Sequence, residues 1–439
     1  MPDAREAGGS WRARSRALAG LREPALALVL AFLGGGLIIW VTSGSLATVG
    51  AAYGGLVGGA LFKTHGLSET IVAAIPYVFM GLALALAFEV GLFNIGVEGQ
   101  FIIGALCAAW AGGRFAGAPA LVHLPLTLAA GAAGGALWAV VPAYLKVKTG
   151  AHEVITLIMM NFIALRLTEY VVSGPLRDGH SSAVQTPRVA ANAELWSLHQ
   201  VPARLGDPLN MLGIALVCAL IAWLTVARLQ RPAPSPRPDS SRRIRKLLPF
   251  SVVAAVGIVV YVGLAPLVRW CWPFNDPYDR LHVGVLLALA AAGAAWWLVR
   301  RTTFGFAMRI IGANPDAARY AGVDVEHTLL LTMALSGALA GVAGSIEVLG
   351  VSTCRCLPLF FSGGYGFESV AIALLAGNNP LGILLGSFLF GALRNGADLM
   401  ELRSGVSKDV ISLIQGLLLL FVAAPALVRY LLRLKERRT

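Results

Sequence analysis

Long apolar runs alternate with short polar segments along almost the whole chain. A run of about 20 apolar residues forms a helix that crosses the hydrocarbon core of a bilayer. The runs lie at 24–42, 70–90, 97–112, 120–142, 152–173, 210–227, 248–268, 282–299, 328–349, 366–377, 381–398 and 410–428. Two of them, 97–112 and 366–377, are too short to cross as simple helices. The pattern predicts an all-α, polytopic membrane protein with about 12 apolar segments.

The composition agrees with this pattern and excludes a soluble globular chain. Of the 439 residues, 57% are hydrophobic and only 13% are charged, and the mean hydropathy is +0.73. A soluble chain would carry about a quarter of charged residues. The 50 glycines suit membrane helices that pack closely through small residues. The first apolar run shows no signal-peptide cleavage pattern, so we expect it to remain as a membrane helix.

Basic residues are distributed unevenly between the two sides of the membrane. If the N-terminus is cytoplasmic, the cytoplasmic segments hold 23 Lys and Arg residues and the outer segments hold 10. Because basic residues favour the cytoplasmic side, both termini are predicted to be cytoplasmic, within basic tails at 1–23 and 431–439. The net charge of +12 then follows mostly from topology, and we expect no nucleic-acid partner.

Two short segments resemble each other at corresponding places in the pattern. Gly96–Gln100 (GVEGQ) and Gly366–Val370 (GFESV) each follow an apolar span, contain Gly-x-Glu and precede a short apolar helix. In the predicted topology these short helices run in opposite directions, which is typical of inverted repeats with broken helices near the midplane. A chance match is the alternative. On the repeat interpretation, residues 24–173 form the first transmembrane repeat and residues 281–430 the second.

The region 174–280 separates the two predicted repeats. It combines an outer loop with an inserted pair of apolar runs, at 210–227 and 248–268. The loop that joins them, 228–247, is rich in Pro, Ser and Arg, which predicts a disordered cytoplasmic segment. Its basic residues either contact anionic lipid head groups or only anchor the topology.

Polar residues at the two predicted breaks are candidates for a substrate path. Ionisable residues inside membrane spans are costly and usually functional, and Glu98 and Glu368 lie at the breaks. Asn94 and Gln100 flank Glu98, and Asn161 lies in an apolar, Met-rich helix. Either these side chains line the path, or the glutamates satisfy backbone groups that the breaks leave unpaired. For Asn161, a hydrogen bond to a neighbouring helix is the favoured alternative.

A polar stretch at 300–327 contains a short helix between two apolar runs. Asn314 suits the N-cap, Pro315 the first helical position and Gly322 the left-handed stop. The resulting helix has roughly two turns. It carries three small residues, Ala317, Ala318 and Ala321, and one large side chain that could anchor a partner, Tyr320. A capped helix of this kind suits a docking partner on the cytoplasmic face, and a simple connector is the alternative.

Patterns that would support enzymatic chemistry are absent from the sequence. There is no G-x-x-x-x-G-K-[ST] motif, so ATP-driven transport would need a separate ATPase subunit. No Ser/His/Asp arrangement or metal-ligand spacing occurs, and we expect no enzymatic activity, cofactor or metal. Cys354 and Cys356, in a predicted outer loop, are expected to be reduced, because cysteines one residue apart rarely close an unstrained bridge. A redox-active pair is the alternative.

Several of these segments together resemble the permeases of ATP-binding cassette (ABC) importers of the ribose, branched-chain amino acid and nucleoside class. The nucleoside permeases are the most similar branch. The resemblance covers residues 24–175 and 281–430. It rests on Gly91–Gln100 (GLFNIGVEGQ), His152–Asn161 (HEVITLIMMN), Arg301–Asp324, Leu335–Gly344 (LSGALAGVAG) and Gly363–Pro380 (GGYGFESVAIALLAGNNP). It implies that Arg301–Asp324, including Gly312, is the loop that couples the permease to an ATPase.

The resemblance also implies a fold, partners and a substrate. Ten helices in two five-helix halves are expected, and the inserted region has no counterpart. The expected partners are a cytoplasmic ATP-binding subunit, a second homologous permease and an extracytoplasmic substrate-binding protein, in a bacterial inner membrane. A nucleoside or related compound is the expected substrate, with simple sugars and branched-chain amino acids as alternatives. An ion-coupled secondary transporter, which also uses inverted repeats and broken helices, is the alternative from another class.

Overall fold

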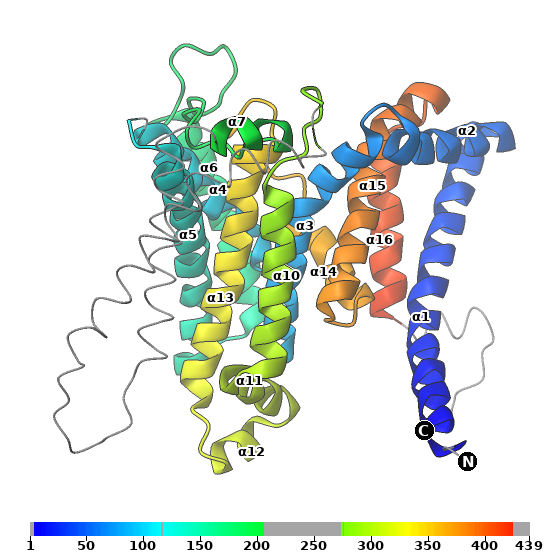
Figure 1. Ribbon diagram of the computed structural model, residues 1–439, viewed down its shortest axis with the longest axis vertical. Helices are drawn as coiled ribbons and strands as arrows, with labels where there is room; N and C mark the ends of the chain where they lie inside the picture. The colour runs from blue at the N-terminus through cyan, green and yellow to red at the C-terminus, as the bar shows by residue number, and fades with distance from the viewer. Residues whose placement is uncertain (1–3, 116, 206–273, 275, 425–439) are drawn as a thin grey trace, which may run out of the picture.

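The computed structural model describes residues 4–115, 117–205, 274 and 276–424, which form a bundle of helices (Figure 1). Within these ranges there is no β-strand, and two isolated bridges join Gln185 to Pro358 and Ser197 to His282. The all-α fold class predicted from the apolar pattern is confirmed. The inserted spans 210–227 and 248–268, their joining loop 228–247 and the tail 431–439 lie outside the described residues.

Each predicted apolar run before the inserted region corresponds to a helix, and α2 is an additional one. The helices are α1 (Ala4–Ser43), α2 (Leu46–Val57) with its π-helical continuation η1 (Gly58–Phe62), α3 (Gly66–Glu89), α4 (Val97–Arg114), α5 (Ala120–Thr149) and α6 (Glu153–Ser173). A 3-10 turn, η2 (Leu198–Gln200), and the short α7 (Val201–Leu205) follow. The predicted run 97–112 is α4, whose 18 residues give a length of about 27 Å, just short of the bilayer core.

Each predicted run after the inserted region also corresponds to a helix, and α11 and α12 lie between two of them. The helices are α10 (Gly284–Arg301), α11 (Thr303–Ala313), α12 (Pro315–Tyr320), α13 (Val325–Ile346) with its π-helical continuation η3 (Glu347–Val351), α14 (Tyr365–Leu375), α15 (Pro380–Ser404) and α16 (Asp409–Ala423). The predicted run 366–377 is α14. Its 11 residues give a length of about 16 Å, so α14 reaches only part of the way through a bilayer.

Six of the described helices are long and apolar enough to cross a membrane. They are Pro24–Ser43, Gly66–Glu89, Ala120–Thr149, Glu153–Ser173, Gly284–Arg301 and Val325–Val351. The span of α3 is 83% buried, whereas those of α1, α5 and α6 are 22% buried, so α3 is the central helix. Shorter apolar helices add to this set, and the predicted polytopic membrane protein is confirmed.

Helices of the two predicted repeats pack against each other in an interleaved way. α13 packs along α4 and α5, whereas α3 packs against α14 and α15 (Figure 1). Glycines allow this approach: a Cβ added to Gly341 of α13 would lie 2.1 Å from the carbonyl oxygen of Gly131 in α5. A Cβ added to Gly104 of α4 would lie 2.3 Å from the Cα of Gly341. Small residues therefore set the distance between these helices, as is common in membranes.

Two helices, α2 and α11, lie where the apolar pattern predicted only connecting segments. Ser45 caps α2 by accepting a hydrogen bond from the Thr48 N–H at 3.4 Å. Thr302 caps α11 by accepting from the Gly305 N–H at 3.0 Å. Both helices are shorter than a membrane span, with 12 and 11 residues, so a search for spans does not detect them.

Candidate functional site

The first helix break, between α3 and α4, is held by a pair of buried amides. Asn94 Nδ2 donates to Gln100 Oε1 at 3.0 Å, and Gln100 Nε2 donates to Asn94 Oδ1 at 2.9 Å. Asn94 also donates to the Ser336 hydroxyl of α13 at 2.8 Å, and Ser336 donates to the Ala83 carbonyl at 2.6 Å. These contacts tie the break to α3 and α13, and they direct both amide groups toward protein partners.

Asn161 joins α6 to the same break. Its Oδ1 accepts from the Gly99 N–H at 2.8 Å, and its Nδ2 donates to the Ile95 carbonyl at 2.9 Å. A Cβ added to Gly99 would lie 2.8 Å from Asn161 Oδ1, so only glycine leaves room for this contact. Asn161 therefore makes a hydrogen bond between neighbouring helices, which was the alternative interpretation of this residue.

Glu98 connects the first break to the second. Its carboxylate is buried and accepts hydrogen bonds from the Ser362 hydroxyl and from the Gly366 N–H at the start of α14. A Cβ added to Gly366 would lie 2.5 Å from Glu98 Oε2. One glutamate of the first Gly-x-Glu segment thus supplies acceptors for the free N–H groups of the second segment. Glu98 thus satisfies a backbone N–H group at a break, which was the alternative to lining a substrate path.

Glu368, in α14, belongs to a neighbouring group of polar and aromatic side chains. The Tyr77 hydroxyl of α3 donates to Glu368 Oε2. Arg394 of α15 donates to the Tyr77 oxygen at 3.3 Å, and its guanidinium lies 4.0 Å from the ring centroid of Tyr365. Glu347 of η3 lies beside Tyr365, and one of its carboxylate oxygens has no partner in the described ranges. We call these residues (Tyr77, Glu347, Tyr365, Glu368 and Arg394) the α14 cluster.

Aromatic rings surround the α14 cluster and the Glu98 carboxylate. Phe101 of α4 and Phe361 stack with centroids 5.2 Å apart and an angle of 14° between their planes. Tyr77 packs against Tyr365 at 4.8 Å and against Phe390 at 5.9 Å. Buried charges and flat rings therefore meet where α3, α4, α14 and α15 come together.

The predicted coupling helix forms as α12. Asn314 Oδ1 accepts from the N–H groups of Asp316 at 2.9 Å and Ala317 at 3.1 Å, and Pro315 is the first helical residue. The helix ends at Tyr320, and Gly322 has a φ of +78°. The predicted cap, start and left-handed stop are confirmed.

The prediction that Ala318 belongs to a small, accessible face of α12 was wrong. Ala318 is fully buried, and it packs in a cluster with Met308, Ile311 and Val325 of the adjoining helices. Its methyl group therefore faces the protein and is not available to a partner. The sequence gives the spacing of the alanines but not the direction from which α11 and α13 cover the helix. The other residues of α12 are all exposed, and Tyr320 is 94% exposed.

Gly312 places the end of α11 directly on the first break. A Cβ added to Gly312 would lie 2.2 Å from the Glu89 carbonyl oxygen, and Gly91, with a φ of +77°, faces the Gly312 Cα. The buried cluster that contains Ala318 also includes Leu92 of the break. Backbone therefore packs directly against backbone between α11 and the α3–α4 break.

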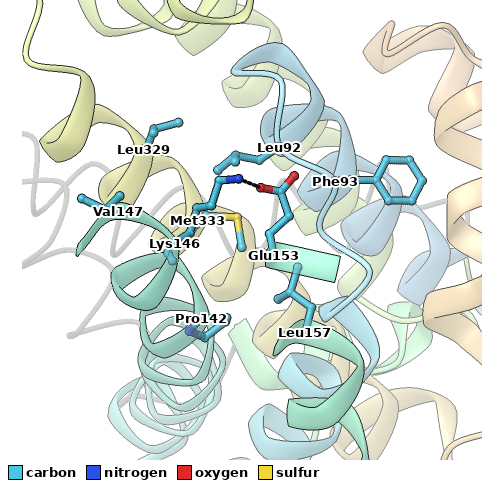
Figure 2. A pocket seen from close by; sticks show the side chains of 10 residues that line it. Leu92, Phe93, Pro142, Lys146, Val147, Glu153, Leu157, Leu329 and Met333 are labelled. Atoms are coloured by element: carbon cyan, nitrogen blue, oxygen red, sulfur yellow. Dashed lines mark ion pairs between the residues drawn. The ribbon is translucent and has the colours of Figure 1, made fainter. Parts of the chain in front are cut away.

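A small pocket lies next to this junction (Figure 2). Leu92 and Phe93 of the break and Met333 of α13 line it, and the ion pair between Lys146 and Glu153 borders it at 3.0 Å. Glu153 begins α6, and His152 precedes it without a capping hydrogen bond from its side chain. The lining is mostly apolar, so the pocket offers few groups for a polar ligand.

The two cysteines that we expected to be reduced form a disulfide instead. Cys354 and Cys356 are bonded, with their Cα atoms 5.2 Å apart. Arg355 between them has a φ of +51°, and this left-handed turn brings the two Cα atoms within the usual range for a bridge. Burial lowers the pKa of the Arg355 guanidinium, and Arg280 and Arg188 act in the same direction. Glu194 opposes the effect and lies 3.9 Å from Arg355.

The structure thus brings the five predicted path residues to two adjoining breaks, while Tyr77, Tyr365 and Arg394 were missed. Tyrosine gives no signal in a search for charged residues inside spans. Arg394 lies inside the predicted span 381–398, but no local pattern indicates its contact with Tyr77. Only the packing of α3 and α15 around α14 shows that these side chains meet.

The fold is that of a polytopic helical membrane protein, and comparison with known sequences identifies it as a permease. The family described as "Branched-chain amino acid transport system / permease component" matches residues 66–230 and 235–423. The chain belongs to this permease family. No solved structure matches it.

Curated relatives of the chain are transport permeases. It is 33% identical over 424 residues to the guanosine ABC transporter permease protein NupP of Bacillus subtilis, covering 96% of this chain and 98% of that protein. It is 27% identical over 417 residues to the nucleoside ABC transporter permease protein NupB of Lactococcus lactis, covering 93% and 92%. It is 30% identical over 371 residues to the glucose ABC transporter permease protein TsgB13 of Haloferax volcanii, covering 84% and 79%.

Proposed function

We propose that the chain is the permease subunit of an ABC importer and forms the path by which a nucleoside crosses the bacterial inner membrane. The observation that carries the proposal is the similarity to a guanosine permease along almost the full length of both chains. The buried aromatic and charged groups around α14 support it, because a nucleoside presents a flat base and several hydrogen-bond donors and acceptors.

The partners follow from the same assignment. A cytoplasmic ATP-binding subunit docks on the exposed side of α12, a second homologous permease completes the membrane unit, and an extracytoplasmic protein delivers the substrate. Both termini are cytoplasmic, as the charge count indicates. Residues 24–173 and 281–430 act as two inverted repeats that rock against each other.

Asn94, Glu98, Gln100, Asn161 and Glu368 have a shared role in this mechanism. All of them except Glu368 hold together the helix ends at the two breaks. Glu368 and the other residues of the α14 cluster face the substrate path. Closure of the ATP-binding subunits moves α12 and α11, and the Gly312–Glu89 contact passes this movement to the first break. Glu98 then carries it to the start of α14 through Ser362 and Gly366.

A sugar importer is the second candidate, since the chain is also 30% identical to a glucose permease. The two candidates are separated by uptake into proteoliposomes that contain the complete transporter and ATP. We expect saturable uptake of labelled guanosine that unlabelled nucleosides inhibit and that glucose, ribose and leucine do not. Preferential uptake of glucose or ribose would replace the nucleoside assignment, and preferential uptake of leucine would exclude both candidates.

A further inference from the structure

The segment between η3 and α14, residues 352–364, joins one end of the bundle to the second break. α13 begins beside α12 and its continuation η3 ends at Val351, so the segment starts at the end of the bundle opposite α12 (Figure 1). It ends at the start of α14, where the Ser362 hydroxyl donates to Glu98. We call residues 352–364 the strap.

The first half of the strap is held by hydrogen bonds to the loop 184–189. The Val189 N–H donates to the Arg355 carbonyl at 2.9 Å, and the Thr186 N–H donates to the Leu357 carbonyl at 3.0 Å. The Leu357 N–H donates to the Thr186 hydroxyl at 2.9 Å. These bonds need the carbonyl of Arg355 and both backbone groups of Leu357 to face the loop. They therefore depend on how the chain turns at Arg355.

The turn at Arg355 is left-handed and is closed by the disulfide. Its φ of +51° lies in a region that residues with a side chain rarely adopt. Cys354 and Cys356 flank it, so their bond closes a small ring that contains the Arg355 backbone. Phe360, further along the strap, also has a positive φ, of +56°. Backbone conformations of this kind persist only where their surroundings impose them, and the disulfide is the covalent part of those surroundings.

The two sulfur atoms differ in access, and each lies near a hydrogen-bond acceptor. Cys354 is half-buried, whereas Cys356 is 1% exposed. Cys354 Sγ lies 3.4 Å from the Cys356 carbonyl oxygen, and Cys356 Sγ lies 3.4 Å from Gln185 Oε1. A disulfide sulfur has no proton to donate, whereas a thiol is a weak donor. Two thiols would therefore find acceptors here, so the site accommodates the reduced state as well as the oxidised state.

We propose that the Cys354–Cys356 disulfide is a thiol-sensitive control of transport: a dithiol reduces the bond, Arg355 leaves its left-handed turn, and the strap loosens. Loss of the turn breaks the Val189 and Thr186 hydrogen bonds at one end of the strap. At the other end it frees Ser362 from Glu98, which fixes the start of α14. The oxidised form is then the transporting form.

The chemical step is an exchange between a dithiol and the disulfide. A thiolate of the reductant attacks the more accessible sulfur, that of Cys354, the bond to Cys356 breaks, and Cys356 leaves as a thiolate that takes up a proton. The second thiol of the reductant then displaces Cys354 from the mixed disulfide. The reductant ends as a disulfide, and its two electrons and two protons end on the two cysteines. On the proposed topology the strap faces the outside, where disulfides persist until such a dithiol reaches them.

The test compares guanosine uptake by the complete transporter in proteoliposomes before and after dithiothreitol, with free thiols counted to confirm reduction. Arg355→Asn and Arg355→Ala are matched variants. Both lack the guanidinium, but asparagine adopts the left-handed turn more readily than alanine does. The double variant Cys354→Ser/Cys356→Ser has no disulfide at this position. Trypsin cleavage after Arg355, identified by product mass, measures opening of the turn without any substrate.

We expect reduction to lower wild-type uptake about fivefold or more, the lower end of the usual coupling between two sites. Cleavage after Arg355 should become faster by a similar factor, because the open form is more populated. After reduction, Arg355→Asn should retain more uptake than Arg355→Ala. The double variant should resemble reduced wild type, with or without dithiothreitol.

Unchanged wild-type uptake after complete reduction would overturn the proposal. Equal losses in the two Arg355 variants would overturn it as well, and so would a further loss when dithiothreitol is added to the double variant. If the double variant does not assemble, the two Arg355 variants decide the outcome. The proposal uses guanosine uptake as its measurement and so rests there on the proposed function. Absence of uptake by the oxidised wild type would reject the proposed function, and an unchanged cleavage rate after Arg355 would then still overturn the control by thiols.

Discussion

Gly312 is the position where a single added methyl group should separate ATP hydrolysis from transport. In Gly312→Ala the new Cβ would lie 2.2 Å from the Glu89 carbonyl oxygen, whereas an ordinary contact needs about 3.5 Å. Both partners are backbone, so neither can rotate away. α11 must move off the α3–α4 break by about 1.3 Å, the difference between the two distances.

The energetic cost of this change can be bounded. Overpacking a close contact costs about 1–3 kcal/mol, and glycine to alanine in a helix returns about 1 kcal/mol at most. The net cost of about 2 kcal/mol or less is too small to unfold a large helical bundle. It is enough to shift the balance between two conformations about tenfold, because 1.4 kcal/mol corresponds to that factor. We therefore expect a folded protein with poor coupling.

The assay compares ATP hydrolysis and guanosine uptake in the same proteoliposomes. Gly312→Ala should retain ATPase activity while uptake per ATP falls about tenfold. Gly293→Ala is the matched control: this glycine is in the middle of α10, and an added Cβ meets nothing within 4 Å. Wild-type coupling in Gly312→Ala would refute the argument that the backbone contact transmits movement. Equal defects in both variants would refute it as well.

Other residues of the breaks and the coupling helix allow further tests. Glu98→Ala should lower thermal stability by about 1–3 kcal/mol because the Gly366 N–H loses its acceptor, whereas Glu98→Gln keeps one acceptor and should lose less. Unchanged unfolding of Glu98→Ala in a thermal melt would contradict the capping role. Asn161→Ala should cost a similar amount, since it leaves the Gly99 N–H and the Ile95 carbonyl unpaired, and the same melt measures it. In intact cells, Ser182→Cys should react with an impermeant thiol reagent and Ala317→Cys should not; the reverse pattern would invert the topology.

The apolar pattern predicted the helices well, because a membrane span is a property of consecutive residues. The α12 cap was predictable for the same reason, since Asn314, Pro315 and Gly322 act within one or two turns. The burial of Ala318 was not predictable, because it depends on which neighbouring helices cover α12.

Long-range contacts account for most of what the sequence could not indicate. The Glu98–Gly366 contact joins residues 268 positions apart, and Tyr77 meets Glu368 across 291 positions. No local pattern encodes these pairs. The disulfide was missed for a different reason: it depends on the left-handed backbone of Arg355, which an arginine rarely adopts.

The source of energy for transport separates an ABC permease from an ion-coupled carrier. The measurement is accumulation of labelled guanosine in proteoliposomes that contain the purified chain, with and without its partner subunits. We predict no accumulation by the chain alone under a proton or sodium gradient, and accumulation once the ATP-binding subunit, the binding protein and ATP are present. Sustained uphill uptake by the chain alone, driven by an ion gradient, would contradict the assignment as an ABC permease.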